Sequence, residues 1–277
     1  MATWFVTGAS EGIGRAVTEH LLAAGHQVAA TARRVERLTG LGQPGRLWTA
    51  ALDVTDTENV RAVVARAFAD LGRIDVVFSN AGRAAFGAAE EVDDETIADQ
   101  IAVNMTGPIQ LVRAVLPFLR AQGGGRIIQT STMGAQITSP GGGMYHASKW
   151  GVEGFLESLV GEVAPFGIGV TMVEPGNVRT GFGAAMSIAP AIDAYARTPV
   201  GQVRRYIEAA GGNLTGAALG DPRKVAAAIV ESADVTPAPR RLVLGSDAFQ
   251  AIRAALTARL DELEAGKTLA ASTDYQD

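Results

Sequence analysis

The chain has 277 residues, and 24 basic against 29 acidic residues give a formal net charge of −5. No block of like charge occurs, so we expect neither a nucleic-acid surface nor a membrane as partner. The sequence has no cysteine, and its three histidines lack metal-ligand spacing, which argues against disulfides and against a metal site. No leader and no bilayer-spanning stretch is recognisable, so a cytoplasmic protein is expected.

The N-terminal stretch predicts a strand, a glycine turn and a helix. Thr3 to Thr7 is apolar and β-rich, and Ile13 to Ala24 is amphipathic. In the turn between them Gly8 allows a tight bend, Gly12 lets a backbone approach a pyrophosphate, and Gly14 permits close helix–strand packing. A plain βα connection stays open as the alternative, because a glycine-rich turn alone is weak evidence. The candidate phosphate-binding residues are Gly8, Ser10, Glu11, Gly12, Ile13 and Gly14.

The second predicted strand, His26 to Ala32, ends at Arg33 and Arg34. In dinucleotide folds this position meets the adenosine ribose, where a carboxylate suits a 2′-hydroxyl and arginine suits a 2′-phosphate. No carboxylate stands here and two guanidiniums follow, which favours NADP(H) over NAD(H). Solvated surface arginines are the alternative.

Two further strands end in small or polar residues. Trp48 to Leu52 leads to Asp53 and Val54, and a helix from Thr57 to Leu71 follows, capped by Thr55 or Asp56. Val76 to Phe78 leads through Ser79 to a run that leaves room beside a flat ring, consisting of Asn80, Ala81 and Gly82. Two structural alternatives remain open: Asp53 could simply be a turn residue, and Asn80 could simply satisfy backbone groups with its side chain.

A long helical segment from Asp94 to Leu119 contains Asn104 and Pro108. Proline inside a helix frees a carbonyl about one turn earlier, and a freed carbonyl can hold a water. A capping or merely buried Asn104 is the alternative.

The central stretch carries Tyr145 and Lys149, four residues apart on a helix predicted to run to about Phe166. That spacing puts an ammonium beside a phenol, and a nearby positive charge lowers a phenol pKa and makes it an acid–base catalyst. Ser131 follows the predicted strand Arg126 to Gln129, so its hydroxyl is expected at the carboxyl end of the sheet, where α/β folds bind ligands.

The last third predicts one more βα unit and an extension. Gly169 to Val173 is a strand closed by Pro175 and Gly176, whereas Asn177 to Gly220 lacks periodicity and is interpreted as a substrate lid. A helix is predicted to begin at Asp221-Pro222, and a last strand at Arg241. A final amphipathic helix should bury one face, either on the domain or on a partner chain; the face is formed by Phe249, Ile252, Leu256, Leu260 and Leu263. The chain should fray from about Gly266.

These βα repeats, with no hairpin signal between them, indicate an α/β fold with a doubly wound parallel sheet. We expect one Rossmann domain over residues 1–245, including the lid at 177–220. Residues 246–277 would form a C-terminal helical extension and not a separate domain.

The glycines at 8, 12 and 14, Asn80-Ala81-Gly82, Ser131, the Tyr145/Lys149 pair and Pro175-Gly176 occur in one order, and this set resembles the classical short-chain dehydrogenase/reductase family. The resemblance covers about Thr3 to Gly245 and implies a seven-stranded sheet in the order 3-2-1-4-5-6-7. It implies Tyr145 as acid–base residue, Lys149 on the nicotinamide ribose, Ser131 as carbonyl-orienting hydroxyl and Asn104 in a water relay. It further implies cofactor contacts from Asp53, Val54, Pro175, Gly176, Val178 and Thr180. Two positions depart from the family pattern, because Ser79 replaces an asparagine and Glu11 stands where NADP-preferring members often carry a basic residue.

The expected function is therefore oxidoreductase chemistry, with hydride passing between NADP(H) and a ketone, aldehyde or secondary alcohol. Mostly apolar side chains near Met133, Gln136 and Met144 suggest a hydrophobic substrate. A non-catalytic dinucleotide sensor is the alternative from another class. The family resemblance also implies a homodimer or homotetramer through the Asp94 and Tyr145 helices.

Overall fold

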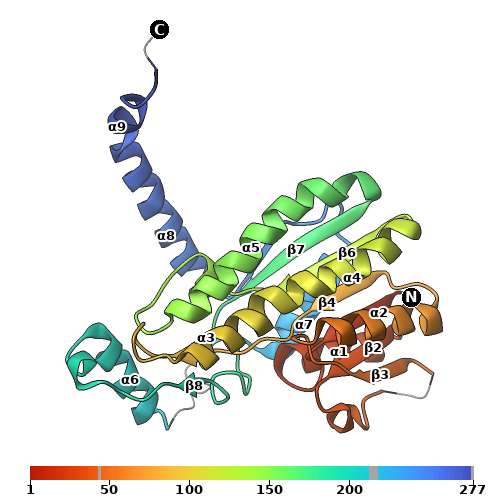
Figure 1. The fold of residues 1–277 in the computed structure, drawn as a ribbon. Helices are drawn as coiled ribbons and strands as arrows, with labels where there is room; N and C mark the ends of the chain where they lie inside the picture. The colour runs from red at the N-terminus through yellow and green to blue at the C-terminus, as the bar shows by residue number, and fades with distance from the viewer. Residues whose placement is uncertain (43–44, 212–217, 276–277) are drawn as a thin grey trace.

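The computed structural model describes residues 1–42, 45–211 and 218–275, and its centre is one parallel sheet (Figure 1). The sheet order is β3-β2-β1-β4-β6-β7-β9, and every neighbouring pair is parallel. Counted along the chain, these seven strands have the order 3-2-1-4-5-6-7, so the predicted topology is confirmed. They are β1 (Thr3–Thr7), β2 (Gln27–Ala32), β3 (Leu47–Ala51), β4 (Val76–Ser79), β6 (Gly125–Thr130), β7 (Ile168–Pro175) and β9 (Arg241–Leu244).

Helices cover both faces of the sheet, as a doubly wound fold requires. One apolar core lies between the sheet and α2, α4 and α5, and the other lies between the sheet and α1 and α7. Alternate residues of β1 enter opposite cores, with Phe5 in the first and Trp4 and Val6 in the second. These helices are α1 (Gly12–Ala23), α2 (Thr57–Leu71), α4 (Gly107–Ala121), α5 (Gly143–Val163) and α7 (Pro222–Ser232).

Helix starts follow the predicted caps. The Asp56 carboxylate accepts hydrogen bonds from the backbone N–H groups of Glu58 and Asn59 at 3.0 Å, which selects Asp56 over Thr55 as the cap of α2. Asp221 likewise caps α7 through the Arg223 N–H at 2.8 Å.

The long helix predicted from Asp94 is interrupted by one wide turn. It comprises α3 (Asp94–Ile101), a π-helical turn (Ala102–Thr106) and α4, and Asn104 lies in the π turn. The continuous run, Asp94–Ala121, is long and apolar enough to cross a membrane by length and composition alone, contrary to the expectation that no segment would be. In the fold it packs against α2 and α5, as the core helix of a globular domain does.

The predicted lid is more regular than its sequence suggested. It contains α6 (Pro199–Ala209) and the two-residue strand β8 (Ser187–Ile188), which pairs with β5 (Ala85–Phe86). No sequence signal indicated α6, which starts at Thr198-Pro199 in a stretch of weak periodicity. Positions 212–217 lie outside the described residues. That this segment is a substrate lid stays a prediction.

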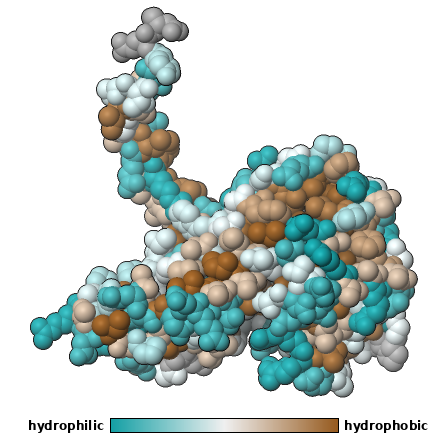
Figure 2. All heavy atoms as spheres, in the orientation of Figure 1, coloured by the Kyte–Doolittle hydropathy of each residue, from teal (hydrophilic) through white to brown (hydrophobic). Residues whose placement is uncertain are grey.

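The C-terminal extension is a helix, α8 (Ser246–Ala265), that projects away from the body and continues into α9 (Lys267–Ala271) (Figure 1). Fraying from Gly266 was thus predicted too early. Ile252 is buried, but Phe249, Leu256, Leu260 and Leu263 are exposed, and apolar side chains are visible along the projecting helix (Figure 2). Among the described residues, the apolar stripe is therefore covered by the domain near Ile252 and is otherwise open.

Candidate functional site

The glycine turn joins β1 to α1 in the geometry a phosphate-binding loop needs. Gly8 and Gly12 have φ of 65° and 58°, in the left-handed region that glycine tolerates. A Cβ on Gly14 would lie 2.3 Å from the Gly8 carbonyl oxygen, so α1 approaches the turn too closely for any other residue. Glu11 precedes α1 and makes no side-chain cap bond, which leaves the first-turn N–H groups facing outward for an anion.

Asn80 braces this turn from the end of β4. Its Nδ2 donates to the carbonyl oxygens of Thr7 at 3.2 Å and Gly8 at 3.3 Å, and its Oδ1 accepts from the Thr130 hydroxyl at 3.1 Å. All the polar atoms of the Asn80 side chain are therefore used within the protein, by the Thr7 and Gly8 carbonyls and by Thr130. A structural role for Asn80 was the alternative that the sequence left open. The backbone N–H groups of Asn80 and Ala81 are also occupied, because they donate to the Thr7 hydroxyl at 2.9 and 3.2 Å.

The end of β2 presents arginines to solvent beside the glycine turn. Arg33 and Arg34 are exposed, and within the described chain their side chains make no ion pair or hydrogen bond. Arg37, which sequence reasoning missed, places Nη1 3.5 Å from the Glu11 carboxylate. Arg37 thus offsets the negative charge of Glu11, the feature that had weakened the case for a phosphate at this spot.

Asp53 and Val54 follow β3 at the same edge of the sheet. The Asp53 carboxylate accepts from the Thr55 N–H at 2.9 Å and the Thr55 hydroxyl at 2.7 Å, so it shapes a turn. Val54 packs tightly on the π turn, since a Cβ on Gly107 would lie 2.8 Å from the Val54 carbonyl oxygen. Val54 thereby ties the end of the third strand to the helix that carries Asn104.

Tyr145 and Lys149 lie on α5 one turn apart, as predicted. Burial lowers the pKa of Lys149 to about 8, although the Glu153 carboxylate opposes the shift, and Lys149 Nζ donates to the Thr130 carbonyl oxygen at 2.9 Å. A Cβ on Gly82 would lie 3.8 Å from Nζ and 3.5 Å from Asn104 Oδ1, so the ends of β4, the π turn and α5 meet here.

The phenol pKa differs from the sequence-based expectation. Burial raises the pKa of Tyr145 to about 12, and a hydrogen bond from the Thr132 side chain offsets only part of that shift. The expected lowering by Lys149 is wrong for this structure, because the ammonium is bound to the Thr130 carbonyl and desolvation of the phenol dominates. A phenol with a raised pKa is protonated at neutral pH, so Tyr145 carries the proton that reduction of a carbonyl consumes.

The structure also corrects the role predicted for Ser131. Its hydroxyl donates to the buried carboxylate of Glu153 at 2.5 Å. Glu153 lies on α5 about two helical turns after Tyr145. The next residue, Thr132, has extended backbone with φ of −171°, and successive side chains of an extended chain point to opposite sides. Thr132 is therefore the hydroxyl beside Tyr145, and the sequence could have indicated it only through that alternation.

Asn104 is fully buried and its side chain is occupied. Nδ2 donates to the Arg83 carbonyl oxygen at 2.8 Å and to the Ser148 hydroxyl at 3.1 Å, and Oδ1 accepts from the Arg83 N–H at 2.9 Å. The side chain fixes the loop after β4. Pro108 has no N–H to donate to the Asn104 carbonyl four residues earlier, and a water relay at that carbonyl stays a prediction.

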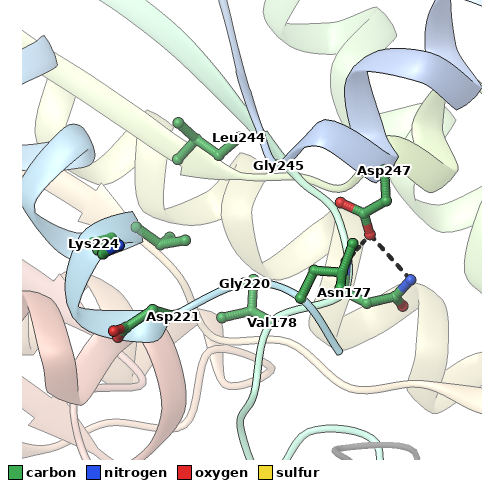
Figure 3. Close-up of a pocket in the computed structure, with 10 residues that line it drawn as sticks. Asn177, Val178, Gly220, Asp221, Lys224, Leu244, Gly245 and Asp247 are labelled. Carbon is green, nitrogen blue, oxygen red and sulfur yellow. Dashed lines mark hydrogen bonds between the residues drawn. The ribbon is translucent and has the colours of Figure 1, made fainter. Parts of the chain in front are cut away.

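The loop after β7 reaches the same edge of the sheet and is held from the C-terminal extension. Gly176 N–H donates to the Leu244 carbonyl oxygen at 2.8 Å, and the Asp247 carboxylate accepts from the Asn177 N–H at 2.8 Å. A cavity of about 240 Å³ lies behind this loop, with Lys224 and Asp247 on its wall (Figure 3). Val178 pairs with Gly220 at the base of the lid.

Thr180 continues this loop toward the glycine turn. Its hydroxyl accepts from the Phe182 N–H at 3.3 Å, and a Cβ on Gly12 would lie 3.6 Å from the Thr180 side chain. The loop that starts at Pro175 therefore lies against the phosphate-binding turn at Gly12.

The 177–220 segment is anchored to the domain by a buried ion pair. Arg204 Nη2 lies 2.7 Å from the Glu91 carboxylate, and Glu91 also accepts from the N–H groups of Ala88 and Ile192. Desolvation raises the Glu91 pKa, but these hydrogen bonds and Arg204 outweigh it and the pKa is lowered, so the carboxylate is ionised. The Phe182 ring centroid lies 6.1 Å from that of Tyr145, which gives the acid–base residue an apolar neighbour.

These features fit a dinucleotide. The glycine turn between β1 and α1 leaves no room for a Cβ at position 14. The N–H groups in the first turn of α1 face outward, and Arg33 and Arg34 stand without partners in the described chain at the end of β2. In the part of the chain that the structure describes, no cluster of three or more potential ligands could hold a metal ion.

Comparison with known proteins gives consistent matches. The family model for short chain dehydrogenase matches residues 2–189. Oxidoreductase BOA17 of Botryotinia fuckeliana is 37% identical over 250 residues, covering 89% of this chain and 90% of that protein. A short-chain dehydrogenase structure from Streptomyces avermitilis has a TM-score of 0.90 and 40% identity, covering 99% of this chain and 100% of the other. A short chain dehydrogenase from Burkholderia cenocepacia in complex with NADP has a TM-score of 0.74 and 25% identity, covering 95% and 96%.

The family model spans well over half of the chain, and the matched relatives agree with it over nearly their full length. The same strands, glycine turn and α5 pair that the matches cover are those that build the site described above. The chain belongs to the short-chain dehydrogenase family of oxidoreductases.

Proposed function

We propose that the protein is an NADP(H)-dependent carbonyl reductase or alcohol dehydrogenase acting on a hydrophobic ketone, aldehyde or secondary alcohol. The observation that carries the proposal is the meeting of Thr132, Tyr145 and Lys149 at the carboxyl edge of the sheet, where the Thr132 side chain is bonded to Tyr145 and Lys149 is bonded to the Thr130 carbonyl. The nicotinamide cofactor, when bound, supplies or accepts the hydride.

The residues of the chain handle the carbonyl oxygen. In the reduction direction the Tyr145 hydroxyl donates its proton to the oxygen as negative charge develops on it, and the Thr132 hydroxyl donates a hydrogen bond to the same oxygen. The buried Lys149 ammonium lies one helical turn from Tyr145 and donates to the Thr130 carbonyl oxygen at 2.9 Å, so it keeps a positive charge at this edge of the sheet. Oxidation of an alcohol reverses these steps.

The cofactor preference rests on charge at the end of β2. Arg33 and Arg34 have no partner among the described side chains, and Arg37 balances Glu11. A 2′-phosphate would meet planar guanidiniums there with charge-assisted hydrogen bonds. The Burkholderia relative, which was solved with NADP, supports the same choice.

The apolar substrate class rests on the lining next to Tyr145. Phe182 lies beside the phenol, and the Phe86 ring closes against Gly141, where a Cβ would come within 2.2 Å of it. Gln136, counted earlier among the neighbours of the site, is instead bonded to Glu153 and Glu174 and is not available to a substrate.

We also propose that the protein is a homodimer or homotetramer. The support is apolar surface that the chain does not cover itself, on α8 and at Trp150 of α5. Light scattering of the purified protein is expected to give twice or four times the 28.7 kDa monomer mass. A monomer at all concentrations would contradict this.

The test of the function is a panel of ketones, aldehydes and secondary alcohols, followed by the absorbance of the reduced nicotinamide with NADP(H) and NAD(H) in parallel. Turnover of hydrophobic carbonyls with NADPH at a higher kcat/KM than with NADH is expected. Binding of NADPH without turnover of any substrate would instead support the non-catalytic sensor.

A further inference from the structure

A cluster of buried charges lies behind the Thr132 loop and joins three elements. Glu153 of α5 and Glu174 of β7 are 3% and 0% exposed, and Arg241 of β9 contacts both carboxylates through Nη1. Arg241 Nη2 also lies 2.7 Å from Glu157 on the surface of α5. Desolvation lowers the Arg241 pKa, but hydrogen bonds and charge from Glu153 and Glu174 outweigh it and raise the pKa, so the guanidinium remains charged.

The Glu153 carboxylate holds both ends of the loop that carries Thr132. Ser131 Oγ donates to Glu153 Oε1 at 2.5 Å, and Gln136 Nε2 donates to Glu153 Oε2 at 2.9 Å. The four residues between these anchors include Thr132, whose side chain is bonded to Tyr145. One carboxylate thus sets the position of the loop relative to the helix on which Tyr145 stands.

The same carboxylate acts on the catalytic helix directly. Glu153 follows Lys149 by four residues on α5, so the two side chains share a face, and both are buried. Burial lowers the Lys149 pKa, and the charge of Glu153 raises it. The charged groups that face Glu153 are Lys149 and Glu157 on α5, Glu174 on β7 and Arg241 on β9.

We propose that Glu153, held by Arg241, is a positioning residue for the reaction: its carboxylate fixes the Thr132 hydroxyl against Tyr145 and stabilises the Lys149 ammonium. This proposal rests on the proposed function. A buried ion cluster is weak evidence for a role in stability, because apolar residues of similar volume often serve as well. Here one carboxylate bonds both anchors of the Thr132 loop and also acts on Lys149, so it influences two parts of the proposed site.

The test compares Glu153→Gln with Glu157→Gln, which removes a carboxylate from the same helix and the same arginine but touches neither the loop nor Lys149. For Glu153→Gln we expect kcat with a good carbonyl substrate to fall about 10- to 100-fold, the size of effect that a small misplacement of a reacting group produces. Binding of NADPH, measured by its fluorescence, should change little. Glu157→Gln should match the wild type in both measurements.

The pH profile separates positioning from loss of fold. Loss of a negative charge beside Lys149 lowers its pKa, so the ammonium is lost at lower pH. The alkaline limb of kcat/KM for reduction should therefore move to lower pH in Glu153→Gln and stay in place in Glu157→Gln. A folded Glu153→Gln protein with wild-type kcat and an unmoved alkaline limb would overturn the proposal, and so would an equal loss in both variants.

Ser131→Ala covers the case in which Glu153→Gln does not fold. It removes one of the two loop anchors and leaves the charge cluster intact, so kcat should fall several-fold with unchanged NADPH binding; an unchanged kcat would overturn the proposal. Failure of the proposed function looks different, because the wild-type protein would then turn over no carbonyl at all.

Discussion

Replacing Thr132 with Val keeps the branched Cβ and removes one hydroxyl from the site. The loss of a donor to a developing oxyanion costs about 10²- to 10³-fold in kcat, or about 2.7–4 kcal/mol. The hydroxyl also accepts from the Gly134 N–H at 3.2 Å, so the substitution leaves that partly buried N–H without its partner, at about 1 kcal/mol of stability. The variant should therefore fold and lose most of its turnover.

The assay is kcat at saturating NADPH and carbonyl substrate, with Ser131→Ala as the matched control one residue away. Ser131 contacts only the Glu153 carboxylate through its side chain, so its loss should cost several-fold where Thr132→Val costs a hundredfold or more. The loss of the Thr132 hydrogen bond should also raise the phenol pKa further. A Ser131→Ala protein impaired as strongly as Thr132→Val, or more, would refute the assignment of the carbonyl-orienting hydroxyl to Thr132.

Three further substitutions test other parts of the site. Arg33→Ala should lower kcat/KM for NADPH about tenfold and leave kcat/KM for NADH unchanged, because an exposed charge-assisted hydrogen bond contributes about 1.4 kcal/mol after screening. An unchanged ratio of the two kcat/KM values would mean that Arg33 does not bind the cofactor. Gly14→Ala should abolish cofactor binding in calorimetry, because its Cβ would lie 2.3 Å from the Gly8 carbonyl oxygen; retained binding would show that the turn can open. Arg204→Met should lower the free energy of unfolding by about 3 kcal/mol in urea titration, because Glu91 is left buried without its cation, and a smaller loss than 1 kcal/mol would mean that the lid is not anchored there.

Much of the fold could be predicted because its signals are local. The turn at Gly8 to Gly14, the Asp221-Pro222 start of α7 and the spacing of Tyr145 and Lys149 each depend on residues within a few positions of one another. α6 was missed because its residues lie in a stretch with little periodicity and are held by a contact with Glu91, 113 positions away from Arg204.

The site was predicted less well where the role of a residue depends on the direction in which its side chain points. Ser131 and Thr132 are neighbours with the same functional group, and only the extended backbone shows that one faces Glu153 and the other Tyr145. The contact between Glu153 and Arg241 joins residues 88 positions apart, so no local sequence pattern predicts it. For α8, periodicity predicted a helix but could not tell that Leu256 and the leucines beyond it would remain exposed.

Tyr145→Phe tests the central claim most directly, because it removes one hydroxyl from a half-buried ring and leaves the glycine turn and the arginines untouched. We predict that kcat for the best carbonyl substrate falls by at least about 10²-fold, the contribution of a positioned general acid, while NADPH binds nearly as in the wild type. A Tyr145→Phe protein that keeps most of the wild-type kcat would contradict the account.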